Sequence, residues 1–540
     1  MRVLCGSLLS VFVACTTPSS VAVDAGGCPA SAAAAGLVNT DRGAVIGTMQ
    51  TDTWAYLGLP YATPPVGALR WQPPQPSACW PTPRMATAFG SACVQLDATD
   101  PTKVVGAEDC LTLNIWAPAS VTPTSALPVL FFIHGGGNVQ GSSSEQRNGV
   151  RIYDGAALAA RTGSVVVTAN YRLGPLGWLA HRSFAVENGH QSAGNYGTLD
   201  QLAALQFVQR NIAGFGGDAT HVLVFGESAG AVNVCALLAS PLAKGLFSSA
   251  LMESGGCVAA TQPVAQTFGD TFAQKVGCTG DLAACLRALD ATTVELAFPE
   301  QANIAGSKPG DFQPNADGWV LPDVPQTMLS SGTHNHVPFV IGSNQDETGQ
   351  VIVTQAPTGM TDPQYRAAVL TFAGNNQTLA DAALAQYPPS QYGGDPRRAF
   401  IALTSDAKFI CTARYIARTV VAHQTEPVFR YQYTHHLDGM PLGPLAKADG
   451  AFHGQELLPL FRHLTLSGYT PSAGEVQLSD AMDGYWSRFG ASGDPNGTGA
   501  VTWPRYDAAT DAVLFLDDVQ QAGAGVRTPQ CDFWDVTLGR

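Results

Sequence analysis

The stretch that most constrains the fold is an abrupt strand-to-helix turn with a serine at its centre. Residues 222–225 form an unbroken apolar run typical of a buried strand, and they lead directly into GESAG at residues 226–230. A helical pattern follows with no intervening loop residues. A reversal this tight forces its central residue into a strained backbone conformation and leaves no room for neighbouring side chains. The glycines two positions before and after Ser228 therefore predict that its hydroxyl projects above the carboxyl end of the strand.

Strand-like and helix-like segments alternate along the chain. We expect buried strands at residues 128–133 and 165–169, and a helix within residues 197–217 that has Gly214 near its end. Continuous β-branched runs between helices predict a mostly parallel sheet with helices on both faces, which is an α/β fold. No linker divides the 540 residues, of which 45% are hydrophobic, so we expect residues 28–540 to form one domain.

Charge and composition exclude several classes of partner. The formal net charge is −14 and the basic residues do not cluster, which argues against binding to a nucleic-acid backbone. The chain has no Cys-x-x-Cys pair, and His334 and His336 lie in a loop rich in serine, glycine and asparagine, so we expect no metal site. The glycines at residues 135–137 precede no Gly-Lys-Ser/Thr, which argues against a phosphate cradle. We expect no cofactor.

The first residues are typical of an export signal. Met1 and Arg2 precede an apolar run, residues 3–14, that is too short to span a bilayer. The sequence FVAC, which ends at Cys15, resembles a bacterial lipoprotein cleavage box, although a phenylalanine stands where leucine is usual. Two alternatives follow. Residues 1–15 are a lipoprotein signal, and a lipidated Cys15 anchors the chain to a membrane, or the leader is an ordinary export signal that is cleaved near residues 22–25. Ten of the 12 cysteines lie beyond this leader, an even number that suits disulfides in a secreted or periplasmic protein.

Ser228 has the setting of a nucleophile for acyl transfer. A serine in a G-x-S-x-G turn between a strand and a helix is a nucleophile elbow, and the helix N-terminus beside it favours developing negative charge. Acyl transfer also needs donors for the oxyanion, and HGGGN at residues 134–138 follows its own strand. We expect the amides of Gly136, Gly137 and Ala229 to form this oxyanion hole.

A general base for Ser228 is expected late in the chain, after the acid of the triad. Five histidines satisfy this order: His423, His435, His436, His453 and His463. His423 falls within an expected helix, and His463 follows the apolar turn LPLF. His453 lies in a loop that opens a helix, a position from which it can reach across the top of the sheet. His435 and His436, at the end of a strand, remain alternatives.

The acid that orients the base is expected just past a strand end. Asp346 and Glu347 both follow the apolar run at residues 338–341, and spacing alone does not choose between them. A buried carboxylate at either position would fix the imidazole tautomer and stabilise the imidazolium.

Together these residues resemble the type-B carboxylesterase/lipase family, whose members include bacterial esterases, animal carboxylesterases and cholinesterases. The likeness extends from Leu37 to Trp534, and EDCLTLN with GESAG is its most specific part. Further matching blocks are GLPYATPPVGALRWQPP, NYRLGPLGWL, GNYGTLDQ, NIAGFGGD and GASGDPNG. The resemblance implies an α/β-hydrolase fold and a serine esterase that forms an acyl-enzyme. It assigns Ser228 as nucleophile, Glu347 as acid and His453 as base.

Two features separate this chain from other members of the family. Asn138 stands where an aromatic residue is common, which predicts a more polar acyl side of the site. Residues 93–110 contain no tryptophan, tyrosine or phenylalanine, so the cation–π site of cholinesterases is missing and a cholinesterase is disfavoured.

Three successive glycines, residues 135–137, tolerate positive φ and can turn a carbonyl out of the cleft. In the family such loops imply room for bulky alcohols.

The resemblance also implies disulfide pairs. It pairs Cys93 with Cys110, Cys278 with Cys285, and Cys411 with Cys531. Two pairings then follow by remainder, Cys28 with Cys79 and Cys235 with Cys257.

Two other functions compete with that of a carboxylesterase. Some members of the family have lost the serine and act only in adhesion or binding, but here all three triad positions are filled. A true lipase is the second alternative, although no clear amphipathic lid is visible in the sequence.

Overall fold

The computed structural model describes residues 28, 31–32, 34–299, 312–437 and 450–540. The expected export signal at residues 1–15, the alternative cleavage region at residues 22–25 and the lipidation site Cys15 lie outside the described residues.

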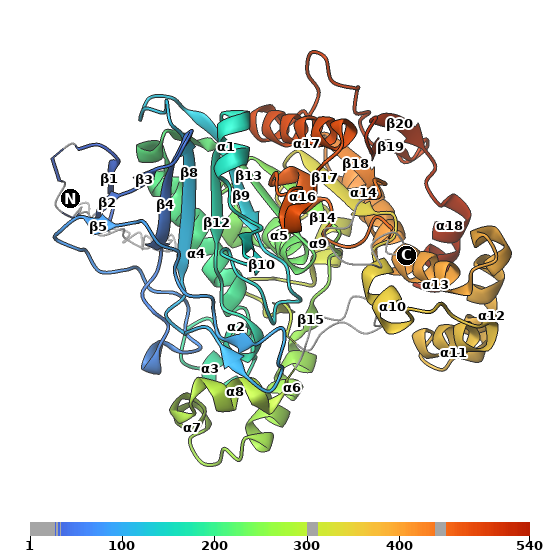
Figure 1. The fold of residues 1–540 in the computed structure, drawn as a ribbon. Coiled ribbons are helices and arrows are strands. Elements are labelled where there is room, and N and C mark those ends of the chain that lie inside the picture. The colour runs from blue at the N-terminus through green and yellow to red at the C-terminus, as the bar shows by residue number, and fades with distance from the viewer. Residues whose placement is uncertain (1–27, 29–30, 33, 300–311, 438–449) are drawn as a thin grey trace, which may run out of the picture.

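The described residues are built around one eleven-stranded mixed sheet (Figure 1). Its strand order is β20-β19-β18-β17-β14-β13-β9-β12-β8-β4-β3. Neighbours from β12 to β19 run parallel, whereas β8, β4 and β3 at one edge and β20 at the other pair antiparallel. In chain order the strands are β3 (Thr48–Met49), β4 (Thr53–Pro60), β8 (Thr112–Pro118), β9 (Leu127–Ile133), β12 (Val165–Ala169), β13 (Gly217–Glu227), β14 (Ser249–Glu253), β17 (Phe339–Asn344), β18 (Val428–Tyr433), β19 (Ala512–Leu516) and β20 (Gln521–Ala524).

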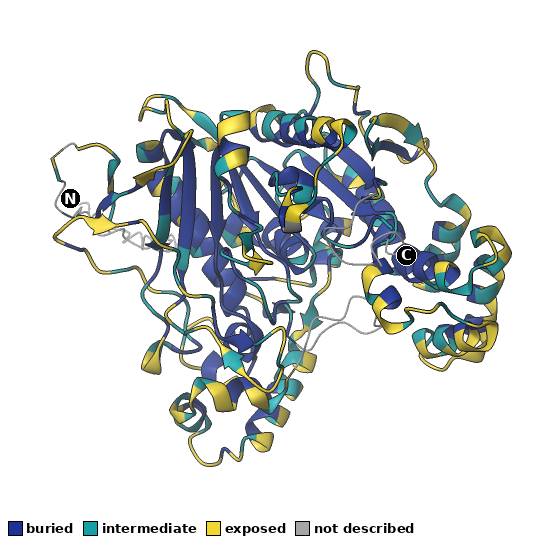
Figure 2. Cartoon of the chain, in the orientation of Figure 1, coloured by how far each residue is buried: buried dark blue, intermediate teal, exposed yellow. Residues whose placement is uncertain are grey.

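Helices cover both faces of this sheet and explain its continuous apolar runs. Alternate residues of a strand point to opposite faces. Phe131 of β9 therefore packs in a core with helices α4 (Tyr196–Asn211) and α5 (Ala229–Ala239), whereas Phe132 packs in a second core with α1 (Ala156–Thr162) and α17 (Ala473–Ser492). Figure 2 shows that most of the length of the central strands is buried. The predicted mostly parallel sheet with helices on both faces is confirmed.

The remaining elements surround this core. The other α-helices are α2 (Gly174–Trp178), α3 (Arg182–Ala185), α6 (Gln262–Lys275), α7 (Leu282–Ala288), α8 (Ala291–Ala297), α9 (Pro325–Ser330), α10 (Gly349–Gln355), α11 (Asp362–Phe372), α12 (Gln377–Gln386), α13 (Pro396–Ser405), α14 (Cys411–His423), α16 (Leu457–Leu460) and α18 (Thr528–Thr537). Shorter turns are η1 (Gly67–Leu69), η2 (Ile212–Phe215), η3 (Pro241–Ala243), η4 (Pro389–Tyr392), the π-helical η5 (Asp406–Ile410) and η6 (Leu466–Gly468). Short strands outside the large sheet are β1 (Leu37–Thr40), β2 (Gly43–Ile46), β5 (Arg84–Met85), β6 (Gln95–Leu96), β7 (Val104–Val105), β10 (Gln146–Arg147), β11 (Val150–Arg151), β15 (Ala260–Thr261) and β16 (Asn315–Ala316).

The expected elements are present, with shifted ends. The strand expected at residues 165–169 is β12, the one at residues 128–133 starts one residue earlier as β9, and β13 extends well beyond residues 222–225. The helix expected within residues 197–217 is α4 followed by η2. Its left-handed cap is Gly216, with φ 81°, two residues beyond Gly214. The 3₁₀ turn carries the chain past Gly214 before it reverses.

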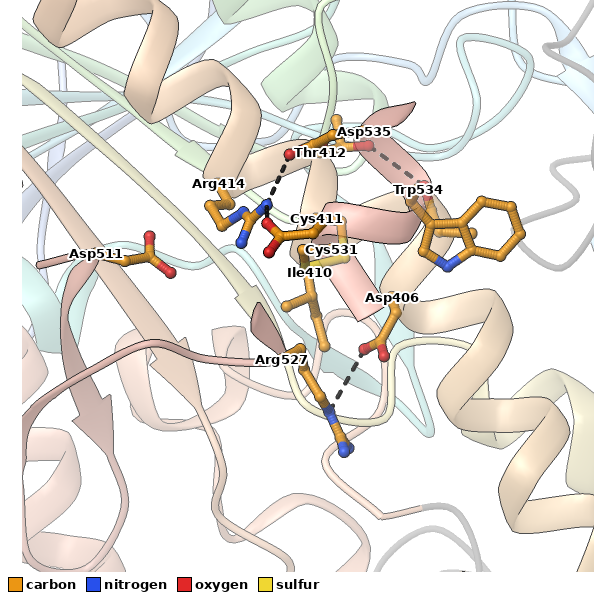
Figure 3. Close-up of a disulfide and its surroundings, with 12 residues drawn as sticks. Asp406, Ile410, Cys411, Thr412, Arg414, Asp511, Arg527, Cys531, Trp534 and Asp535 are labelled. Atoms are coloured by element: carbon orange, nitrogen blue, oxygen red, sulfur yellow. Dashed lines mark hydrogen bonds and ion pairs between the residues drawn. A yellow bond between two sulfur atoms is a disulfide. The ribbon is translucent and has the colours of Figure 1, made fainter. Parts of the chain in front are cut away.

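Five disulfides connect the described cysteines, and all five expected pairs are confirmed. The pair Cys411–Cys531 joins the start of α14 to the C-terminal helix α18 (Figure 3). Beside it, the buried guanidinium of Arg414 lies 2.6 Å from a carboxylate oxygen of Asp532 and 2.7 Å from one of Asp535. Covalent and ionic contacts together therefore hold α18 against the body of the protein.

No helix among the described residues is long and apolar enough to cross a membrane.

We predict that Cys411–Cys531 stabilises the fold more than a short-range disulfide does. The bridge spans 120 positions, against 7 for Cys278–Cys285. Chain entropy gives about 4–5 kcal/mol for the long loop and about 2 kcal/mol for the short one. The double variant Cys411→Ser/Cys531→Ser should thus lose more free energy of unfolding than Cys278→Ser/Cys285→Ser in denaturant titrations. Equal losses, or a free thiol at Cys411 or Cys531 in peptide maps of exported protein, would contradict this.

Candidate active site

Ser228 occupies the turn between β13 and α5, as the sequence predicts. Its backbone angles are φ 58° and ψ −120°, a conformation that costs energy in a residue with a side chain, and its amide donates to the carbonyl of Glu253 at 2.9 Å. A Cβ added to Gly230 would lie 2.0 Å from the carbonyl oxygen of Ile133, and one on Gly226 would lie 2.7 Å from the backbone of Gly230. The two glycines are therefore required because the turn packs against the end of β9. The side chain of Ser228 stays partly exposed.

The buried Glu347 pairs with the partly buried His453, although 106 positions separate the two residues in the chain. Nδ1 of His453 lies 2.6 Å from Oε2 of Glu347, and its amide donates to the carbonyl of Glu347 at 3.1 Å. The other carboxylate oxygen accepts from the amide of Asn344, the last residue of β17, at 2.7 Å. Because both oxygens of Glu347 are engaged and the side chain is fully buried, the imidazole is held with Nε2 directed away from Glu347.

The alternative residues from the sequence lie in other ion pairs. His435 is buried between Asp517 and Glu475, with a carboxylate oxygen 2.9 Å from Nδ1 and another 3.2 Å from Nε2. Nε2 of His436 lies 3.3 Å from Asp346. Both nitrogens of His435 are thus occupied, and Asp346 pairs with His436 rather than with His453.

Sequence reasoning missed the second carboxylate that contacts His453. Nε2 of the imidazole lies 3.1 Å from Oε1 of Glu227, the residue just before Ser228. Within the described part of the chain, no hydrogen bond joins the Ser228 hydroxyl to His453. Glu227 is the second residue of GESAG, so the sequence places a carboxylate next to Ser228. The apolar pattern identifies this residue only as the end of a buried strand.

Charges around His453 change the pKa of the groups involved. Burial opposes a charged imidazole, but the negative charges of Glu227 and Glu347 outweigh it and raise the pKa of His453 to about 9. Burial also raises the pKa of Glu227 to about 7, against the lowering effect of His453. The two groups therefore stabilise each other's charged forms, an imidazolium on His453 and a carboxylate on Glu227.

Two more buried glutamates lie behind this pair. Oε1 of Glu253 accepts from the indole of Trp486 at 2.7 Å, and Glu456 accepts from the side-chain amide of Asn344. Burial raises the pKa of Glu253 well above its usual value and that of Glu456 to about 8. Neither residue could be recognised from the sequence, since a lone glutamate in an apolar segment belongs to no motif.

The glycine loop after β9 presents unpaired amides beside the Ser228 turn. Gly136 and Gly137 have positive φ of 103° and 66°, whereas Gly135 does not. A Cβ on Gly135 would lie 2.7 Å from the Glu227 carboxylate and 3.0 Å from Cβ of Ser228, so this glycine allows the loop to approach the serine. Among the described residues, the amides of Gly136, Gly137 and Ala229 donate to no acceptor. Unpaired donors at a turn and at a helix N-terminus are ready to bind an anion.

The carbonyls of Gly135 and Gly136 have hydrogen-bond partners within this loop. The Gly136 carbonyl accepts from the amides of Val139 and Gln140 at 3.2 and 3.0 Å. The Gly135 carbonyl lies 2.9 Å from Nδ1 of His134. These contacts leave the Gly135 and Gly136 carbonyls directed at partners in the loop.

Asn138 adopts the left-handed conformation, with φ 63°, in which asparagine is enriched. Its side chain is buried, and its oxygen accepts from the amide nitrogen of Asn233 in α5 at 2.9 Å. The side-chain oxygen of Asn138 therefore points toward α5.

The histidines considered as metal ligands have other partners. Nε2 of His334 lies 3.1 Å from the side-chain oxygen of Gln424, and that of His336 lies 3.0 Å from the carbonyl of Gly332. His435, Asp517 and Asp518 bring three possible ligand atoms together in the described residues. Since carboxylates already contact both nitrogens of His435, ion pairing accounts for this cluster.

The chain is similar in sequence to known proteins of one family. The pattern that describes the Carboxylesterase family matches residues 34–534. The chain belongs to the carboxylesterase family. A para-nitrobenzyl esterase from Bacillus subtilis (strain 168) is 35% identical over 496 residues, which cover 89% of this chain and 94% of that protein. A fumonisin B1 esterase from Sphingopyxis macrogoltabida is 35% identical over 503 residues, or 90% of this chain and 88% of that protein.

A solved structure agrees with these relatives. A structure titled PNB esterase superposes with a TM-score of 0.77 at 34% identity and covers 92% of this chain and 99% of its own. The family resemblance and the α/β-hydrolase fold that it implied are thus confirmed, and this member of the family is a carboxylesterase.

We predict that hydrolysis by this carboxylesterase rises with pH along a limb above the ordinary imidazole value of ~6.5. A general base must be neutral, and the two glutamates raise the pKa of His453, so deprotonation requires higher pH. Glu227→Gln removes one of the two charges and should move the limb of kcat/KM to lower pH.

The control for this shift is Glu426→Gln, which removes a glutamate remote from His453 and should leave the limb in place. A limb at the same pH in Glu227→Gln and in the unmodified enzyme would show that Glu227 does not charge the imidazole.

Proposed function

We propose that the protein hydrolyses carboxylic esters of small molecules through an acyl-enzyme on Ser228, with His453 as general base and Glu347 as the orienting acid. The observation that carries this proposal is the buried 2.6 Å contact between Glu347 and Nδ1 of His453, beside the strained turn that presents Ser228. Glu347 leaves Nε2 as the nitrogen that takes the serine proton.

In the proposed reaction Ser228 Oγ attacks the ester carbonyl as its proton passes to Nε2 of His453. The oxyanion is stabilised by the amides of Gly136, Gly137 and Ala229, whose lack of other acceptors in the described residues supports this role. The imidazolium then protonates the departing alcohol. Water, activated in turn by His453, releases the acid and restores the serine.

Glu227 is proposed to hold the imidazole between turnovers. Its carboxylate oxygen lies 3.1 Å from Nε2. Because Ser228 must give its proton to the same nitrogen, the imidazole exchanges Glu227 for the serine hydroxyl when substrate binds. Loose catalytic hydrogen bonds before substrate binds are common in such sites.

We further propose that residues 28–540 act as one catalytic domain that is exported, to a secreted or periplasmic location or to a membrane through a lipidated Cys15. The five disulfides support an oxidising compartment.

Replacing the proposed base tests the triad. His453→Ala should lower kcat/KM for p-nitrophenyl acetate by about 10³-fold or more, and Ser228→Ala should abolish labelling by a fluorophosphonate probe. His435→Ala and His436→Ala are the matched controls and should retain labelling. Near-normal activity in His453→Ala would transfer the role of base to another histidine, and an unlabelled wild-type serine would contradict the mechanism.

The glycine loop predicts hydrolysis of esters of tertiary alcohols. Because the Gly136 carbonyl accepts hydrogen bonds from the amides of Val139 and Gln140, we expect it to leave room beside the proposed oxyanion hole for a branched leaving group. Purified enzyme should cleave tert-butyl acetate measurably and n-butyl acetate faster, as followed by release of acetic acid. Rapid cleavage of the n-butyl ester with no cleavage of the tert-butyl ester would show that other side chains close this space.

A further inference from the structure

A cavity of about 360 Å³ lies next to the segment that carries Glu347, and the proposed reaction does not use it. Its wall includes Gln345 and Asp346, the two residues before Glu347, together with residues of η4 and α13 and Arg527 near the C-terminus. The volume lies in the range of small-molecule sites in proteins.

The charges in the cavity wall do not balance. Arg527 is paired, since its Nε lies 3.6 Å from the buried carboxylate of Asp406 (Figure 3). Asp346 is also compensated, because it lies 3.3 Å from Nε2 of His436 and accepts from the amide of Ala451 at 3.2 Å.

Arg398 is the exception, because its exposed side chain makes neither an ion pair nor a hydrogen bond with any residue that the structure describes. The wall therefore holds one guanidinium whose charge no described carboxylate neutralises.

The wall also includes Tyr392 and apolar side chains. The hydroxyl of Tyr392 is buried, and within the described ranges it has no hydrogen-bond partner. The side chains of Ile401 and Ala402 from α13 add apolar area. An unpaired guanidinium favours a carboxylate, which it can bind through two parallel hydrogen bonds, and the apolar part favours an organic group attached to it.

We propose that this cavity binds a small organic carboxylate, with Arg398 pairing its charge and Tyr392, Ile401 and Ala402 contacting its organic part. Acids of this class are also what ester hydrolysis releases, and to that extent the choice of ligand rests on the proposed function. Binding itself requires no turnover, so it can be measured separately from the reaction.

Titration calorimetry with sodium benzoate tests the site. We expect saturable binding to the unmodified protein, and at least tenfold weaker binding to Arg398→Ala. The matched control is Arg366→Ala on α11, which removes an exposed arginine that pairs with Asp362 and should leave the affinity unchanged. Hydrolysis of p-nitrophenyl acetate should be unaffected by Arg398→Ala, because Arg398 is outside the proposed triad and oxyanion hole.

Three results would overturn the inference. One is no binding of benzoate to the unmodified protein, and another is equal affinity in Arg398→Ala, which would place the ligand elsewhere, such as beside Ser228. The third is binding of inorganic phosphate, titrated in parallel, as tightly as benzoate, which would make the cavity a general anion site. Failure of Ser228 to react with a fluorophosphonate would contradict the proposed function but not this binding site.

Discussion

The site depends on the close contact between the turn at Ser228 and the end of β9. Gly226 and Gly230 let the backbone reverse against Ile133 with no space for a Cβ, so Ser228 is presented at the N-terminus of α5, close to the glycine loop after β9. The same contact makes Gly135 necessary, because a side chain there would strike Glu227 and Ser228. A steric constraint on the backbone thus determines where the proposed nucleophile can lie.

Electrostatics then distinguish the proposed base from the other histidines. His453 lies between two buried glutamates, whereas His435 lies between the buried Glu475 and the partly exposed Asp517. The arrangement has a cost, since buried carboxylates are stable only when they share charge with a partner or hold a proton. Burial is the main cause of the raised pKa of Glu227, Glu253 and Glu456, and the negative charges of neighbouring glutamates raise it further.

The C-terminal part of the chain is held to the sheet by contacts of long range. The disulfide from α14 to α18 and the ion pairs of Arg414 lie near η5, whose Phe409 packs its ring 5.0 Å from that of His453. The residues that hold the C-terminal helix in place are therefore neighbours of those that pack against the proposed base.

The sequence by itself determined the class of fold, the elbow at Ser228, the glycine loop and the disulfide pairs, because each depends on local patterns or on family blocks that the letters preserve. Spacing left Asp346 and Glu347 open, and only the family resemblance favoured Glu347. The tertiary structure then placed Glu347 on His453 and Asp346 on His436. It also brought Glu227 to the second nitrogen of the imidazole and assembled the cavity at Arg398. These contacts join residues far apart in the chain, and their distances follow from how strands and helices pack, which no local pattern records.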